Sequence, residues 1–274
     1  MNFLKSIIFG FLSGVAQFLP ISSAAHQQLI ASVLDIDFTD PIRKLFIHVS
    51  ILIALFIETA QIRAHLSKAQ NASKRNRTRN SGLTKTEADH QFLRNMKLPF
   101  LIVFFFISYI LPKGINLLLV SVFLLINGIL LFLPERMLQG NKNAKVMTKL
   151  DGVMIGAIGG LSAFPGLSCI GSLLFAASFR GADRKSAVNW ALILSITALY
   201  AWIFRDILEL FSGISFSFWS NFFWNITSAL CAFTGSRFSI YILKRHIRKI
   251  GCTSYAYYCW GAALFALMLF LTIA

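Results

Sequence analysis

Charged residues are scarce in this chain of 274 residues. Asp, Glu, Lys and Arg make up 14% of the sequence, whereas ordinary soluble domains contain about 25%. Hydrophobic residues make up 56%, and 27 residues are Phe, which a lipid-facing surface tolerates and a water-facing surface does not. The composition excludes a typical soluble domain and predicts an all-α, polytopic membrane protein.

Cysteine pairs are also missing. The four cysteines are Cys169, Cys231, Cys252 and Cys259, and no two of them form a C-x-x-C motif. Three lie in or beside apolar segments, so we expect them to be small buried side chains. The N-terminal apolar stretch has no A-x-A-like cleavage site, so no cleavable signal peptide is expected.

The net charge of +15 comes from basic residues that gather in short segments between apolar runs. These segments are 63–97, 135–150, 180–186 and 244–250. Such clustering is typical of cytoplasmic loops beside anionic headgroups, and it argues against a nucleic-acid partner. Residues 63–97 are predicted to form a basic cytoplasmic loop.

Apolar runs long enough for a bilayer predict six spanning helices. They lie at Leu45–Ile62, Leu98–Leu111, Ile115–Leu133, 187–204, 220–243 and 254–273. A short amphipathic stretch with Arg205, Asp206 and Glu209 is expected between two of them. Two further apolar stretches, 3–34 and 151–179, are interrupted by proline and serine, and each is predicted to form a re-entrant hairpin of two half-helices.

The two interrupted stretches have the same build. One contains GFLSGVAQFLPISSAAHQQ and the other GVMIGAIGGLSAFPGLSCIGS. An offset of 145 positions places Pro20 on Pro165 and Ser23 on Ser168. Two broken, glycine-rich segments in corresponding halves of a membrane chain indicate a binding site at the interface of an internal repeat.

Loop charges predict the orientation of the chain. If every basic segment is cytoplasmic, residues 3–34 enter and leave the membrane on the outer side, and 151–179 do so on the cytoplasmic side. The chain 1–274 is then one transmembrane domain made of two inverted repeats, about 1–134 and about 150–274.

The hairpin tips predict an anion site. A half-helix that begins inside the membrane presents free N–H groups and a positive dipole end, and two facing ends suit a phosphate carried by a lipid. The candidate binding residues are Ser22, Ser23, His26, Gly166, Ser168 and Gly171. Two purely structural roles stay open, because the serines could cap their own half-helices and the glycines could serve helix packing. His26 is a candidate functional group or a neutral hydrogen-bonding residue.

At these residues the chain resembles a known family. QFLPISSAAH resembles the first signature of the undecaprenyl-diphosphate phosphatase family, also called the bacitracin-resistance family, and FPGLSCIG resembles its P-G-x-S-R-S-G signature. RGADRKSAVNWALILSI and KRHIRKIGCTSYAYYCWG follow in family order. The resemblance implies six spanning helices with two inverted re-entrant hairpins. It also implies hydrolysis of undecaprenyl diphosphate at the outer face of the bacterial inner (plasma) membrane, which recycles the lipid carrier of cell-wall synthesis.

The chain departs from the family pattern at four positions. Ser13 and Gln17 stand where the family has two glutamates four residues apart, which share a helix face. Cys169 stands where the second signature has arginine, and Cys259 where an arginine is usual in the last helix. The resemblance implies Mg²⁺ or Ca²⁺ on the glutamates, but those ligands are missing here, so no metal residue is predicted.

Two hypotheses from different classes follow. The first is a divergent phosphatase in which His26 or Ser23 acts as nucleophile or general base, with Ser13 and Gln17 lining the substrate site. The second is a non-catalytic, flippase-like binder or transporter of undecaprenyl phosphate. The expected partner is a polyprenyl phosphate or diphosphate in the membrane, and the sequence leaves a homodimer open.

Overall fold

The computed structural model describes residues 3–36, 40–75, 85–111, 116–137, 140–212, 218–247 and 251–273. In these ranges the chain is all-helical and has no β-strand. The helices are α1 (Phe3–Phe18), α2 (Ser23–Leu34), α3 (Pro41–Arg75), α4 (Lys85–Ile110), α5 (Leu117–Arg136), α6 (Lys149–Gly160), α7 (Cys169–Phe179), α8 (Arg184–Ser212), α9 (Phe218–Ile242) and α10 (Thr253–Ile273), with a 3₁₀ turn at Leu161–Ala163 and a π turn at Leu243–Ile247.

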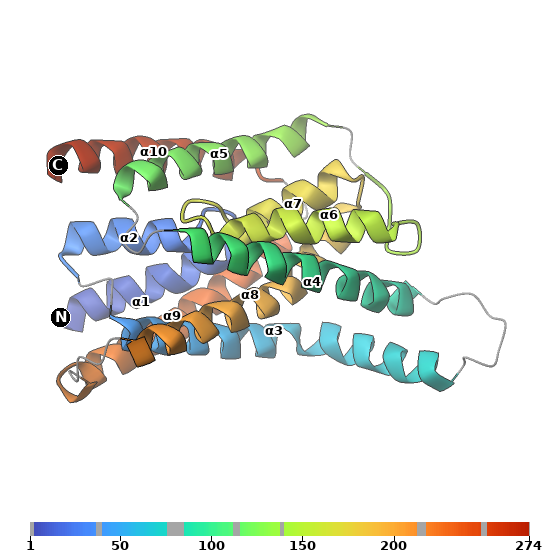
Figure 1. Cartoon of the computed structure of the whole chain (residues 1–274), viewed down its shortest axis with the longest axis horizontal. Coiled ribbons are helices and arrows are strands. Elements are labelled where there is room, and N and C mark those ends of the chain that lie inside the picture. Colours follow the sequence, from blue (N-terminus) through green and yellow to red (C-terminus); the bar gives the residue numbers. More distant parts are fainter. Residues whose placement is uncertain are drawn as a thin grey trace.

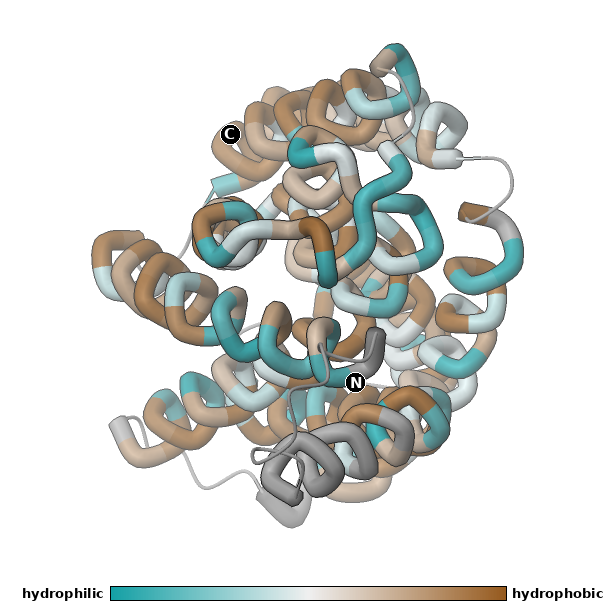
Figure 2. Tube along the Cα trace, turned by 90° about the vertical axis from the view of Figure 1, so that its right-hand side faces the viewer, coloured by the Kyte–Doolittle hydropathy of each residue, from teal (hydrophilic) through white to brown (hydrophobic). Residues whose placement is uncertain are grey.

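Six helices in the described part of the chain are long and apolar enough to cross a membrane: α3, α4, α5, α8, α9 and α10. They run roughly along the long axis of the molecule (Figure 1). Apolar residues, coloured brown in Figure 2, lie along the helices at the outside of the bundle. Their outward faces carry large exposed apolar side chains such as Phe106, Tyr109 and Leu271, as expected where lipid replaces water. The prediction of an all-α membrane protein with six spanning helices is confirmed.

The basic segment 63–97 is more helical than expected. Helix α3 continues to Arg75 and α4 begins at Lys85, so only 76–84 lie outside the described residues. Residues 63–75 are rich in Ala, Gln, Lys and Arg, which are good helix formers. A helix therefore continues beyond the membrane when the polar residues that follow also favour helical backbone.

Four helices are much shorter, and they come in two consecutive pairs. Helices α1 and α2 have 16 and 12 residues, and α6 and α7 have 12 and 11. At 1.5 Å per residue even α1 reaches only about 24 Å, less than the roughly 30 Å of a hydrocarbon core. Each pair is joined by a turn that contains a proline, Pro20 or Pro165. Proline lacks a backbone donor and does not continue a helix, so the first helix of each pair ends before it.

The start of α6 and the end of α7 are tied together by Asp151. Its carboxylate accepts a hydrogen bond from the N–H of Thr148 at 2.8 Å, in a capping box, and one from Nε of Arg180 at 2.6 Å. Burial opposes the charged form, but the hydrogen bonds from Thr148 and Arg180 outweigh it and hold the pKa of Asp151 below its ordinary value. The two ends of this hairpin therefore lie at the same end of the bundle.

Glycines let each hairpin approach a long helix. A Cβ on Gly14 of α1 would lie 2.1 Å from the carbonyl oxygen of Ala232 in α9. A Cβ on Gly156 of α6 would lie 2.2 Å from the carbonyl oxygen of Met96 in α4. These glycines serve helix packing, which is the structural role that the sequence left open for glycine in these stretches.

We expect Gly156→Ala to lower the free energy of unfolding by about 1–3 kcal/mol, the usual cost of overpacking a close contact. Gly261 is the matched control, since it is also helical but no atom lies within 4 Å of a Cβ placed there. Thermal unfolding in detergent should show a lower midpoint for Gly156→Ala and an unchanged or higher one for Gly261→Ala. Equal midpoints would contradict the packing role.

Candidate site at the two hairpin turns

The two proline-containing turns touch each other. The backbone N–H of Gly166 donates to Oγ of Ser22 at 3.1 Å, and Oγ of Ser168 donates to the carbonyl oxygen of Leu19 at 3.4 Å. Residues 144 and 149 positions apart are thus directly bonded. The structure brings the two motifs into one buried junction, as the sequence pattern predicted.

Asn127 of α5 holds this junction from the side. Its Nδ2 donates to the carbonyl oxygen of Pro20 at 2.9 Å, and its Oδ1 accepts from the N–H of Ser168 at 2.9 Å. The side chain is fully buried. A single amide therefore satisfies one backbone group of each turn, which neither turn could satisfy alone.

Ser22 and Ser168 cap the helices that follow them. Oγ of Ser22 accepts from the N–H of Ala25 at 3.5 Å, and Oγ of Ser168 accepts from the N–H of Gly171 at 3.2 Å. Both serines are almost completely buried. Both hydroxyls therefore cap their own helices as well as bridging the two turns. In its capping role Ser168 is therefore equivalent to Ser22. The sequence offset of 145 positions had aligned Ser168 with Ser23, one position further on.

The backbone of Ser22 is strained. Its φ is 71°, in the left-handed region that costs a non-glycine residue energy. Gly166, at the other turn, has φ of 121°, and a Cβ there would meet Phe123. The cross-turn bond from Gly166 to Ser22 joins these two unusual positions and helps to keep both in place.

His26 lies one turn into α2 and is held at both ring nitrogens. Nδ1 lies 2.8 Å from the carbonyl oxygen of Ser22, and Nε2 lies 2.8 Å from the hydroxyl of Tyr258 in α10. A carbonyl oxygen only accepts, so in the neutral ring Nδ1 carries the hydrogen and Nε2 accepts from Tyr258. The two rings are also stacked, 5.5 Å apart. The sequence singled out His26 but did not indicate Tyr258.

The other predicted residues differ in burial and in the hydrogen bonds that they form. Ser13 is fully buried, and its Oγ donates to the carbonyl oxygen of Phe9 at 2.6 Å, within its own helix. Gln17, one turn further on, is half-buried. Ser23 is half-buried and accepts a hydrogen bond from Nε2 of Gln27 at 3.2 Å. Of the predicted side chains, Ser23 and Gln17 form no described hydrogen bond to either turn, and His26 bonds to the first turn through Nδ1 alone.

The cysteines match the prediction of buried side chains in part. All four are free thiols, and Cys252 and Cys259 are buried, whereas Cys169 and Cys231 are only partly buried. Sγ of Cys259 accepts from Nδ2 of Asn127 at 3.3 Å, so it lies directly behind the junction. Cys169 is the first residue of α7. Both thiols stand where the family resemblance implies arginine.

Comparison with known proteins decides the family. Residues 6–265 match the family model of the bacitracin resistance protein BacA. The chain belongs to this family. It is 26% identical over 286 residues to undecaprenyl-diphosphatase 3 of Bacillus cereus, covering 98% of each chain. It is 27% identical over 270 residues to an undecaprenyl-diphosphatase of Methanococcus maripaludis, covering 97% of this chain and 99% of the other.

The junction of this BacA family member does not fit the divalent cation that the resemblance implied. Among the described residues no three His, Cys, Asp or Glu side chains come together as a metal would need. The side chains on α1 at the family positions are Ser13 and Gln17, both neutral, and the hydroxyl of Ser13 is bonded within its helix. Mg²⁺ and Ca²⁺ prefer carboxylate oxygens, and this donor set supplies none.

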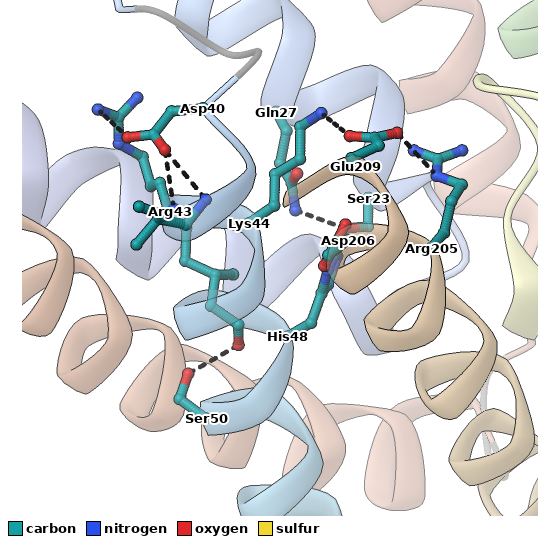
Figure 3. Close-up of polar contacts among 12 residues, drawn as sticks. Ser23, Gln27, Asp40, Arg43, Lys44, His48, Ser50, Arg205, Asp206 and Glu209 are labelled. Carbon is teal, nitrogen blue, oxygen red and sulfur yellow. Dashed lines mark hydrogen bonds and ion pairs between the residues drawn. The ribbon is translucent and has the colours of Figure 1, made fainter. Parts of the chain in front are cut away.

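A second polar cluster lies at the start of α3 and the end of α8 (Figure 3). Lys44 pairs with Glu209 at 3.2 Å, and Nδ1 of His48 pairs with the fully buried carboxylate of Asp206. The predicted amphipathic stretch with Arg205, Asp206 and Glu209 forms the last turns of α8, which ends at Ser212. The cross-helix pairs hold these turns against α3. The cluster fastens α3 to α8.

Asn127→Ala should lower the free energy of unfolding by about 1–3 kcal/mol, because it removes a buried hydrogen bond to the backbone of each turn. The control is Asn141→Ala, since Asn141 is exposed. Denaturation in detergent, followed by circular dichroism, should separate the two variants. A loss no larger than that of the control would show that Asn127 does not hold the turns together.

Proposed function

We propose that this protein removes the terminal phosphate from a polyprenyl diphosphate at the junction of its two hairpin turns. The proposal rests on the meeting of both motifs at one place, with His26 beside them. It also rests on the chain's membership of the BacA family and on relatives that are named undecaprenyl-diphosphatases. The expected substrate is undecaprenyl diphosphate in the bacterial inner membrane, where its hydrolysis returns the carrier to cell-wall synthesis.

We further propose that α1–α2 and α6–α7 are re-entrant hairpins in two inverted repeats. Three observations support this. The four helices are too short to span, the Asp151–Arg180 pair brings both ends of one hairpin together, and α1 packs on α9 in the way that α6 packs on α4. With the basic segments in the cytoplasm, the α1–α2 hairpin enters from the outer face and the site opens there.

The first turn of α2 is where we expect the terminal phosphate. The N–H groups of Ser23 and Ala24 begin this helix and have no acceptor within it. The dipole adds positive potential at the same place, and the half-buried hydroxyl of Ser23 adds a third donor. A lipid phosphate at this point would meet these neutral donors, because neutral residues stand where the family pattern has charged ones.

His26 is the group suited to activate water. In the neutral ring its Nε2 carries a lone pair and faces the hydroxyl of Tyr258. A water that replaces this hydroxyl would give its proton to Nε2 while its oxygen attacks the terminal phosphorus. The bond from phosphorus to the bridging oxygen then breaks, which releases inorganic phosphate and leaves a polyprenyl monophosphate. The carbonyl of Ser22 holds Nδ1–H and so fixes the ring for this transfer.

We expect a low rate of hydrolysis, because neutral residues stand where the family pattern has charged ones. Phosphoryl transfer depends on neutralising charge on the phosphate oxygens, and one well-placed arginine is worth roughly 10³–10⁵ in rate. Cys169 and Cys259 cannot supply this charge. We therefore expect slow hydrolysis that does not depend on added Mg²⁺ or Ca²⁺.

Growth of bacterial cells tests the proposal. The protein is expressed from a strong promoter in a bacterium depleted of its own undecaprenyl-diphosphatases. We expect wild-type protein to restore growth and to raise tolerance of bacitracin, and His26→Ala to do neither at equal membrane abundance. Failure of abundant, folded wild-type protein to restore growth would favour the non-catalytic binder.

A further inference from the structure

A separate cavity of about 570 Å³ lies between α3, α4 and α8. Its wall includes Phe56, Leu101, Phe105, Tyr200 and Phe204. None of the described residues that line it belongs to the short helices or to the two hairpin turns. Its size is in the range of cavities that hold small organic ligands, and the proposed hydrolysis does not use it.

The cavity is basic at one end and apolar at the other. Arg63 of α3 and His90 and Lys97 of α4 line it, on the parts of these helices that lead toward residues 76–84. Phe105 of α4 lies eight residues beyond Lys97, which is about 12 Å along the helix. No Asp or Glu is among the described residues that line the cavity. The wall therefore matches a molecule with an anionic head and an apolar tail.

Arg63 is held in position at this basic end. Its Nη2 donates to the carbonyl oxygen of Phe56 at 2.7 Å, and its Nε donates to Oγ1 of Thr59 at 3.3 Å. The guanidinium also lies 4.2 Å from the centre of the Phe56 ring, and that ring packs edge-on against Tyr200. The cation is thus fixed to the wall where the apolar part begins, so little side-chain entropy is lost when an anion arrives.

We propose that this cavity binds an anionic glycerophospholipid, with its phosphate at Arg63 and Lys97 and one acyl chain along Leu101 and Phe105. Basic pockets between transmembrane helices are suited to anionic headgroups. The cavity lies between three helices that are long and apolar enough to span the membrane, so the surrounding bilayer is the source of such lipids. With the basic segments placed in the cytoplasm, the lipid comes from the cytoplasmic leaflet, opposite to the proposed mouth of the phosphatase site.

Native mass spectrometry of the detergent-solubilised protein tests this site. The protein is titrated with dioleoyl phosphatidylglycerol, which is anionic, or with dioleoyl phosphatidylcholine, which is zwitterionic. We expect the anionic lipid to bind at least about tenfold more tightly, and Arg63→Gln with Lys97→Gln to remove this preference. Lys145→Gln with Lys149→Gln is the control, since it removes the same charge from exposed positions outside the cavity. Thr197→Trp, which fills the cavity, should weaken binding of the anionic lipid.

Three results would overturn the proposal. They are equal affinity for the two lipids, an equal loss in the control variant, and displacement of phosphatidylglycerol by undecaprenyl phosphate at equal concentration. Cross-linking gives a readout on the wild-type protein alone. A photoactivatable phosphatidylglycerol should label Leu101, Phe105 and Tyr200, and labelling spread evenly over the six spanning helices would contradict the site. These measurements need no turnover, so they stand or fall separately from the proposed hydrolysis.

Discussion

Ser13→Glu, Gln17→Glu and Cys169→Arg, introduced together, should raise phosphate release from undecaprenyl diphosphate by about 10³–10⁵-fold, the value of a well-placed arginine in phosphoryl transfer. Two carboxylates four residues apart on α1 share one helix face and supply the oxygen ligands that Mg²⁺ prefers. Hydrolysis by this variant should therefore depend on Mg²⁺. The measurement is the initial rate with purified protein in detergent, with and without the ion.

Two partial variants serve as controls for this gain. Cys169→Lys supplies charge without the planar fork of arginine and should recover only part of the rate. Ser13→Glu alone buries a carboxylate at a fully buried position, so its effect on folding has to be measured beside its rate. A folded triple variant that is no faster than wild type would show that these positions do not face the reacting phosphate.

Replacement of His26 should have the second-largest effect. We expect His26→Ala to lower the rate by about 10²–10⁴-fold, the usual contribution of a general base. Tyr258→Phe keeps the stacked ring and removes only the hydroxyl that faces Nε2, so its effect should be far smaller. The rates of both variants are compared with the rate of wild type. The same two substitutions are also made in the triple variant, whose higher rate makes a loss easier to measure.

The outcome of these two variants separates catalysis from structure. If His26 only supports the fold, His26→Gln should restore the rate, because an amide can still bond to the carbonyl of Ser22. If His26 is the base, His26→Gln should stay as slow as His26→Ala. Retention of the full rate by His26→Ala would remove His26 from the mechanism.

Much of this architecture is already visible in the sequence, because it depends on local signals. Apolar length predicts the six spanning helices, and proline predicts the breaks near Pro20 and Pro165. The lengths of the helices were harder to predict, since α3 continues to Arg75. Hydropathy reports where a membrane ends, whereas helix propensity decides where a helix ends.

The contacts that build the site depend on long-range geometry. Asn127 reaches Pro20 across 107 positions, and Tyr258 reaches His26 across 232. A polar residue within the apolar run of α5 was the one available signal for Asn127. Likewise, only backbone geometry shows that Ser22, and not Ser23, shares the capping role of Ser168. Ser23 therefore has no capping role, and its Oγ accepts from Nε2 of Gln27 instead.

The most direct measurement is the turnover of the wild-type protein itself. Purified protein is mixed with undecaprenyl diphosphate, and inorganic phosphate and undecaprenyl phosphate are both followed over time, with and without Mg²⁺. We expect slow, saturable formation of both products in equal amounts, insensitive to the ion and lost in His26→Ala. Saturable binding of the lipid with neither product formed would contradict it and would identify the junction as a binding site alone.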